Sequence, residues 1–145
     1  AYEAALRLDR SSANLVDLGY VQERLMTLAA AEQSYREALQ KETNNPLAHA
    51  GLGRLALQQQ RYADARLFLE RAVALDKANG SLFIDLGKLE RAEGNHEKAL
   101  EAFQRAITLD PTDIEAYTEA AATLRQLGRG EEAEALLKQP GETPQ

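Results

Sequence analysis

The chain repeats its own pattern at a fixed interval of 34 residues, which is the spacing from one Leu-Gly pair to the next. The three pairs are Leu18-Gly19, Leu52-Gly53 and Leu86-Gly87. Alanines keep the same step at Ala31, Ala65, Ala99 and Ala133, and again at Ala38, Ala72 and Ala106. A period of this size is typical of stacked identical units, so we expect an array of repeats rather than one closed core.

Each period predicts two amphipathic helices joined by a turn, because its apolar residues recur every three to four positions. The predicted helices cover 13–26 and 29–41, 46–59 and 62–75, 81–92 and 96–109, and 114–127 and 131–138. Asn45-Pro46 predicts a helix start, since asparagine caps orphan amides and proline suits the first position. Ser11 or Ser12 can cap the first helix, and Thr112 with Glu115 predicts a capping box. Gly94 is predicted to lie in a turn with a left-handed backbone conformation, which glycine adopts at little cost.

These residues resemble the tetratricopeptide repeat, whose unit is an antiparallel helix pair. The third period is the closest match, with Leu86, Gly87, Gly94, Ala99, Phe103, Ala106 and Pro111. The family's first-helix tryptophan position holds Leu15, His49, Phe83 and Tyr117, and Ala120-Ala121 replaces the Leu-Gly pair in the fourth period. The resemblance implies an all-α protein, a right-handed α-solenoid (superhelix) of stacked antiparallel helix pairs.

The repeats divide the chain into one predicted domain and a tail. We expect a tetratricopeptide domain over 1–138, made of the end of a preceding helix (1–9), full repeats at 12–45, 46–79 and 80–113, and a degenerate repeat at 114–138. Residues 139–145 have no apolar content and are predicted to be disordered.

Composition excludes several classes of function. A net charge of −6 argues against nonspecific nucleic-acid binding, which calls for a basic stripe. The sequence has no run of 18 apolar residues, so we expect no membrane insertion. Zero cysteines exclude disulfides and thiolate sites within this segment and leave cytoplasm and periplasm both open. The Ala- and Arg-rich, cysteine-free composition looks bacterial.

We find no residues that predict catalysis, a metal or a cofactor. The only histidines, His49 and His96, are interpreted as packing residues. Acidic residues such as Glu97, Glu131 and Glu132 lie in first turns, where the helix dipole favours them. Gly128-Arg129-Gly130 lacks the spacing and preceding strand of a phosphate loop. We therefore expect a non-enzyme.

The resemblance implies that the first helix of each pair lines a concave groove that binds an extended or helical peptide. We call the predicted residues of this groove the first-helix face. They are Val16, Tyr20, Arg24, Leu47, Ala50, Arg54, Leu57, Ile84, Lys88, Arg91, Thr118 and Arg125. Five of them are cations, against the nearby carboxylates of Glu23 and Glu115, and Val16, Ala50 and Ile84 are expected to stack beside these cations as an apolar stripe.

This pattern predicts a non-catalytic protein–protein interaction scaffold whose first-helix face binds an acidic peptide with aliphatic anchors, since charge complementarity gives specificity. Two alternatives stay open. The chain is a self-association module through exposed solenoid ends, forming a homo-oligomer, or it is a regulatory or targeting domain of a larger protein.

Overall fold

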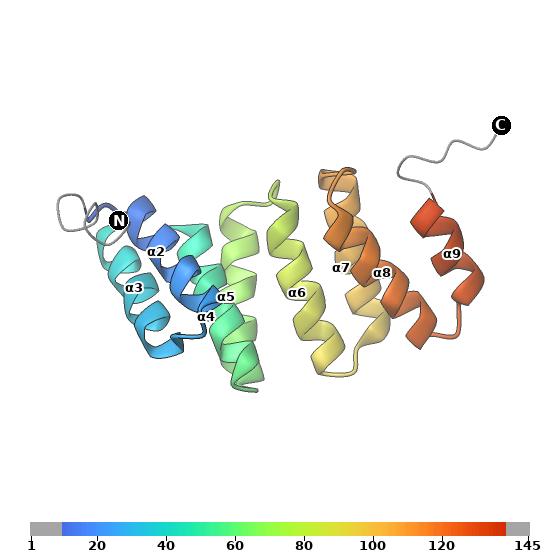
Figure 1. The fold of residues 1–145 in the computed structure, drawn as a ribbon, viewed down its shortest axis with the longest axis horizontal. Coiled ribbons are helices and arrows are strands. Elements are labelled where there is room, and N and C mark those ends of the chain that lie inside the picture. Colours follow the sequence, from blue (N-terminus) through green and yellow to red (C-terminus); the bar gives the residue numbers. More distant parts are fainter. Residues whose placement is uncertain (1–9, 139–145) are drawn as a thin grey trace. The chain divides into compact units, whose positions relative to one another are not determined.

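The computed structural model describes residues 10–138, which form four helix pairs (Figure 1). The first helices of the pairs are α2 (Ser12–Arg24), α4 (Pro46–Gln58), α6 (Gly80–Ala92) and α8 (Ile114–Gln126). The second helices are α3 (Leu28–Lys41), α5 (Tyr62–Leu75), α7 (His96–Leu109) and α9 (Gly130–Lys138). All eight helices lie within two residues of their predicted bounds. The predicted end of a preceding helix (1–9) and the predicted disordered tail (139–145) lie outside the described residues.

The chain divides into two compact units. Unit 1 ends at Asp76 and contains α2 to α5, whereas unit 2 begins at Lys77 and contains α6 to α9. In unit 1 α2 packs on α3, α4 on α5, and α3 on α4; in unit 2 α6 packs on α7, α7 on α8, and α8 on α9. None of the helices between residues 10 and 138 is long and apolar enough to cross a membrane.

A side-chain cap starts every first helix at the same place in the repeat. The caps are Ser11, Asn45, Asn79 and Asp113. The Oδ1 of Asn45 accepts bonds from the amides of Leu47 and Ala48 at 3.0 and 3.2 Å, which satisfies amides that have no partner inside the helix.

The predicted capping box with Thr112 at its head is wrong by one residue. Asp113 is the cap, and its Oδ1 accepts from the Glu115 amide at 3.0 Å. The amide and hydroxyl of Thr112 instead donate to Asp110 Oδ1, at 3.0 and 2.6 Å. Asp110 holds Thr112 in the preceding turn, so the hydroxyl is not available to the helix.

A left-handed residue ends every first helix. Gly94 and Gly128 have φ of 83° and 77°, which confirms the prediction for Gly94. The equivalent positions in unit 1 hold Met26 and Gln60, with φ of 63° and 60°. These two side chains occupy a conformation that glycine adopts at much lower cost.

Glycines on the first helices let large side chains of the second helices lie flat against them. In unit 1 an added Cβ would come within 2.7 Å of the Tyr35 ring at Gly19 and within 2.3 Å at Gly51. In unit 2 an added Cβ at Gly87 would lie 2.5 Å from the Phe103 ring. Tyr35 and Phe103 are fully buried, so the glycines create the space in which each core packs.

Candidate functional site

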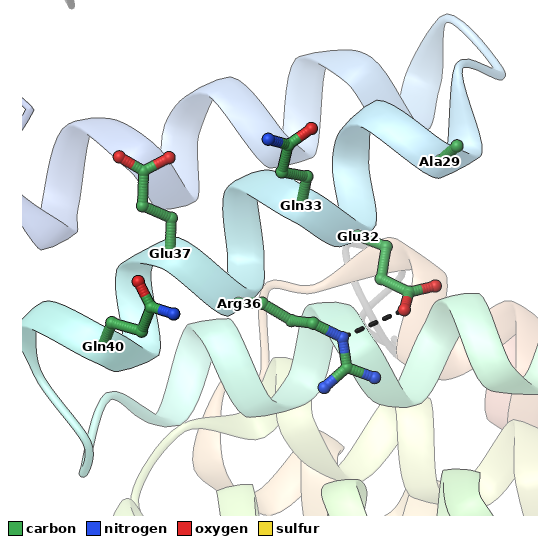
Figure 2. A pocket seen from close by; sticks show the side chains of 6 residues that line it. All are labelled: Ala29, Glu32, Gln33, Arg36, Glu37 and Gln40. Atoms are coloured by element: carbon green, nitrogen blue, oxygen red, sulfur yellow. Dashed lines mark hydrogen bonds and ion pairs between the residues drawn. The ribbon is translucent and has the colours of Figure 1, made fainter.

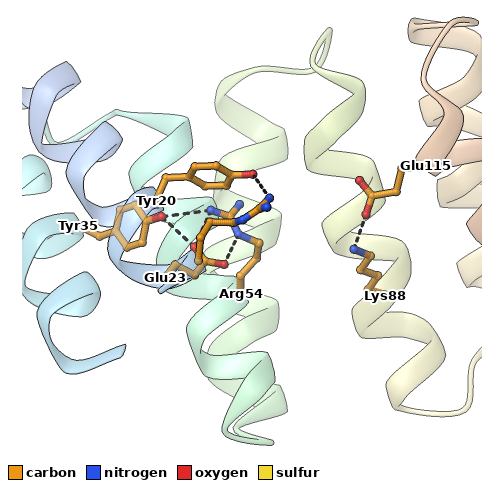
Figure 3. Close-up of polar contacts among 7 residues, drawn as sticks. Tyr20, Glu23, Tyr35, Arg54, Lys88 and Glu115 are labelled. Atoms are coloured by element: carbon orange, nitrogen blue, oxygen red, sulfur yellow. Dashed lines mark hydrogen bonds and ion pairs between the residues drawn. The ribbon is translucent and has the colours of Figure 1, made fainter. Parts of the chain in front are cut away.

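The first-helix face of unit 1 is built on an ion pair between α2 and α4. Arg54 Nε lies 2.8 Å from Glu23 Oε2, and Arg54 Nη2 lies 3.0 Å from Glu23 Oε1. The Tyr35 hydroxyl donates to Glu23 Oε1 at 2.8 Å and accepts from Arg54 Nη2 at 3.3 Å. Figure 3 shows the three side chains meeting, so the pair joins two repeats and is anchored on a buried hydroxyl.

Burial determines the titration of Tyr35. The side chain is fully buried, and burial raises the pKa of its hydroxyl well above the ordinary value. The guanidinium of Arg54 opposes the rise in pKa, and the Glu23 carboxylate adds to it. The hydroxyl therefore stays protonated and keeps donating to Glu23.

Tyr20 presents an exposed ring beside this pair. The side chain is 48% exposed, and the guanidinium carbons of Arg24 and Arg54 lie 5.9 and 5.7 Å from its ring centroid. Its hydroxyl accepts from Arg24 Nη1 at 3.4 Å. An exposed ring in contact with two cations is the kind of group that anchors protein interfaces.

The remaining predicted residues of unit 1 differ in exposure. Leu47 on α4 is 46% exposed, and Leu57 is half-buried. Val16 and Ala50 are buried, at 8% and 0% exposed. Val16 packs in the core with Leu15, Ala31 and Tyr35.

In unit 2 the predicted residues lie on α6 and α8. Lys88 Nζ pairs with Glu115 Oε1 at 2.6 Å, and Arg91 pairs with Glu119 and lies over the Phe103 ring at 5.6 Å (Figure 3 shows the Lys88 pair). Arg125 pairs with Glu134 of α9 at 3.1 Å. Thr118 is exposed, but its hydroxyl donates to Ile114 O of its own helix at 2.9 Å.

The predicted apolar stripe of Val16, Ala50 and Ile84 is wrong. Ile84 is 3% exposed and packs with Phe103 and Ala120, as Val16 does with the core of unit 1. Helical periodicity groups these residues on one side of the helix but does not say which way that side turns. Val16 and Ile84 are covered by neighbouring first and second helices of their own units, so they offer no exposed apolar stripe.

The predicted cations of the first-helix face are also mostly paired in the structure. Arg54, Lys88, Arg91 and Arg125 each pair with a carboxylate of their own unit. The sequence pattern did not predict Glu119 and Glu134 as partners, or Tyr35 as the buried anchor. The spacing of opposite charges could have indicated these pairs. Glu23 and Arg54 are 31 residues apart, which is one repeat less about one helical turn. Lys88 and Glu115 are 27 residues apart, which is one repeat less about two helical turns.

A hollow lies elsewhere, on the exposed side of α3. It has a volume of about 540 Å³, and its described lining comes from α3 alone: Ala29, Glu32, Gln33, Arg36, Glu37 and Gln40 (Figure 2). Arg36 pairs with Glu32 at 2.9 Å, and Arg10 pairs with Glu37 at 2.6 Å. The charges of its described lining are therefore satisfied within the chain, and among residues 10–138 no polar groups converge there from different helices.

The histidines lie in packing positions. His49 is half-buried on α4, with Nε2 3.0 Å from Thr43 O and its ring 6.4 Å from that of Phe68. His96 is half-buried at the start of α7. Between residues 10 and 138 no three His, Cys, Asp or Glu side chains are grouped as a metal ion would need.

Comparison with known protein families identifies the family of this chain. A family model described as tetratricopeptide repeat matches residues 27–86 and 90–145. The chain belongs to the tetratricopeptide repeat family. The resemblance inferred from the Leu-Gly and alanine positions is thereby confirmed, and the family fold is consistent with a protein-interaction scaffold.

One curated relative and two solved structures illustrate how similar the chain is to known proteins. The chain is 29% identical over 125 residues to the TPR repeat-containing protein YpiA of Bacillus subtilis, covering 82% of this chain and 30% of YpiA. The crystal structure of MamA is similar with a TM-score of 0.74 and 26% identity, over 95% of this chain and 81% of MamA. YrrB, described as a TPR protein with an unusual peptide-binding site, has a TM-score of 0.74 and 23% identity, over 97% and 75% of the two chains. These neighbours confirm the predicted all-α tetratricopeptide solenoid class.

Most curated relatives are far longer than this chain. It spans 14%, 6% and 17% of the first three that it matches.

Proposed function

We propose that the chain is a non-catalytic protein-interaction domain in which the part of the first-helix face on α2 and α4, in unit 1, binds a peptide segment of a partner protein. The single observation that carries the proposal is Tyr20, which is 48% exposed although the guanidinium groups of Arg24 and Arg54 lie over its ring. Rigid aromatic side chains that stand exposed lose little entropy on contact and often dominate binding energy.

The exposure of Leu47 supports the same face. Leu47 stands 46% exposed on α4, the first helix next to α2, on the side that also carries Arg54 and Leu57 at helical spacing. α2 and α4 are in contact within unit 1, so an extended peptide that crosses both helices meets Tyr20 and the α4 side chains together. YrrB shares this fold and is described as having a peptide-binding site, so the fold can hold a peptide.

The ion pairs change the kind of peptide we expect. Four of the five predicted cations are already neutralised, so a strongly acidic ligand would compete with the protein's own carboxylates. We propose that apolar contact supplies most of the affinity, and that charge selects among the peptides that make it.

A peptide selection tests this proposal. Phage-displayed random decapeptides are selected on the immobilised chain, and the enriched peptides are synthesised and titrated by fluorescence polarisation. Tyr20→Ala is expected to weaken binding about tenfold or more, as loss of an aromatic anchor does. Leu67→Ala is the matched control, because Leu67 is 70% exposed but lies on the second helix α5.

The outcome separates the first-helix face from other surfaces. Equal affinities for wild type and Tyr20→Ala, or a loss with Leu67→Ala alone, would overturn the proposal. Circular dichroism of each variant checks that the helices are retained.

A second candidate function is self-association, favoured by one patch. Val21, Leu25 and Met26 at the end of α2 are 40%, 69% and 66% exposed, and adjacent exposed apolar residues favour association. If this patch joins two copies, sedimentation velocity gives a concentration-dependent mass that Leu25→Asp returns to that of the monomer. A monomer at all concentrations would exclude it.

The length of the relatives supports a third role for the segment, as a regulatory or targeting domain of a larger protein. This role uses the same binding face, so the selected peptides would resemble a segment of the partner to which such a protein is directed.

A further inference from the structure

Arg24 differs from the other cations of the first-helix face. Arg54, Lys88, Arg91 and Arg125 are each paired with a carboxylate of their own unit. Arg24 is exposed and has no carboxylate partner among residues 10–138. The neighbouring carboxylate of Glu23 is held by Arg54 and Tyr35, so it does not neutralise Arg24.

The surroundings of Arg24 orient it without neutralising it. Its guanidinium carbon lies 5.9 Å from the Tyr20 ring centroid, and its Nη1 donates to the Tyr20 hydroxyl at 3.4 Å. Asp17 is exposed on the same helix, about 10 Å towards the N-terminus at 1.5 Å per residue. Its opposite charge therefore limits how far a ligand carboxylate can shift along α2.

We propose that Arg24 and Tyr20 form the subsite that determines specificity, and that it recognises a peptide in which one acidic side chain stands beside an apolar one. The inference rests on the proposed function. Arg24 forms the charged bond to the carboxylate, and the exposed Tyr20 ring packs against the neighbouring apolar side chain. Because Arg24 keeps several N–H donors free, it can bind both oxygens of a carboxylate.

The other cations are poorer sites for the same carboxylate. At Arg54 a ligand would have to displace a two-point bond, in which the Glu23 side chain is only 10% exposed. At Lys88 it would have to displace Glu115 from 2.6 Å, and at Arg125 it would have to displace Glu134 from 3.1 Å. In each case a new ion pair replaces an old one, so the net gain is small.

A double-mutant cycle tests the assignment. The probe is a decapeptide selected on the wild-type chain, together with its analogue in which the acidic residue is replaced by the matching amide. For the wild-type chain the amide analogue is expected to bind about fivefold more weakly, the effect of one exposed ion pair. For Arg24→Gln the two peptides are expected to bind equally, whereas for Arg125→Gln the fivefold difference should persist.

The outcomes separate this inference from the proposed function. Selected peptides that lack an acidic residue, or a fivefold difference that persists in Arg24→Gln, would overturn the subsite and leave the peptide-binding face standing. A selection that enriches no peptide overturns both. Repeating the titration in 0.5 M NaCl should reduce the fivefold difference for wild type, since salt screens an exposed ion pair.

Discussion

Arg54 of α4 binds both carboxylate oxygens of Glu23 of α2, at 2.8 and 3.0 Å, and so ties the second helix pair to the first. The Glu23 side chain is 10% exposed and that of Arg54 is 24% exposed. A paired charge at this depth is satisfied, but the same charge left alone is costly, because the interior solvates it poorly.

Removing the cation of this pair is expected to destabilise unit 1. Arg54→Leu leaves the Glu23 carboxylate with the Tyr35 hydroxyl alone, and we expect the free energy of unfolding to fall by about 2–3 kcal/mol. Urea denaturation followed by circular dichroism measures the change. Arg36→Leu is the control: Arg36 makes an exposed pair with Glu32, so its loss is expected to cost under about 1 kcal/mol. Equal effects of the two substitutions would show that the Glu23 pair has no special role.

The Tyr35 hydroxyl is expected to give unfolding a distinctive pH dependence. Below pH about 10 the hydroxyl is protonated in both states, and its stabilising effect is complete. Above that pH the unfolded chain loses this proton while the folded chain keeps it, because burial raises the pKa of Tyr35 in the fold. The free energy of unfolding therefore falls as pH rises, by up to about 1.4 kcal/mol per pH unit for this group.

Tyr35→Phe isolates that contribution. The variant is expected to lose about 1 kcal/mol at neutral pH with the hydrogen bond to Glu23. Denaturant titrations of both proteins between pH 8 and 11 cover the ordinary tyrosine pKa. Over this range the free energy of unfolding should decline less steeply for the variant than for the wild type. Parallel declines would mean that Tyr35 does not retain its proton in the fold.

The left-handed positions predict opposite effects in the two units. Gln60→Gly is expected to stabilise by about 0.5–1 kcal/mol, since it relieves a residue at φ 60°. Gly94→Ala is expected to destabilise by about 1 kcal/mol. An added Cβ at Gly94 would meet no atom within 4 Å, so the backbone conformation alone sets that cost. Thermal midpoints of the two variants measure both effects, and a stabilising Gly94→Ala would contradict this explanation.

Gly87→Ala is expected to destabilise unit 2 by about 1–3 kcal/mol, because the added Cβ would lie 2.5 Å from the Phe103 ring. Phe103→Leu in the same chain should recover part of that loss by making room. Gly130→Ala, where an added Cβ meets no atom within 4 Å, serves as the control. No recovery in the double variant would mean that Phe103 is not the obstacle. The midpoints of urea denaturation of the three variants measure these differences in stability.

The sequence predicted the helices well because their ends depend on local chemistry. Asn45 and Pro46 favour a helix start, and α4 begins at Pro46. Gly94 favours a left-handed turn, and it adopts one after α6. The regular step of 34 residues then gave the repeat. Thr112 was misassigned because two neighbouring residues could each serve as the cap, and only the turn made with Asp110 decides between them.

The charges of the first-helix face were harder to predict because their partners lie on other helices. Lys88 and Arg91 are on α6, but Glu115 and Glu119 are on α8. Which residues meet depends on how far each helix is rotated and shifted against the next, and a single sequence fixes neither. Ile84 shows the same limit, since a small rotation separates a core residue from an exposed one.

Chemical-shift mapping of a selected decapeptide on the ¹⁵N-labelled chain tests the central claim most directly. We predict that the shifted amides lie on α2 and α4, with the largest changes around Tyr20 and Arg24. Shifts confined to α3 and α5, for example along the hollow at Glu32 and Gln33, would contradict a peptide site on the first helices.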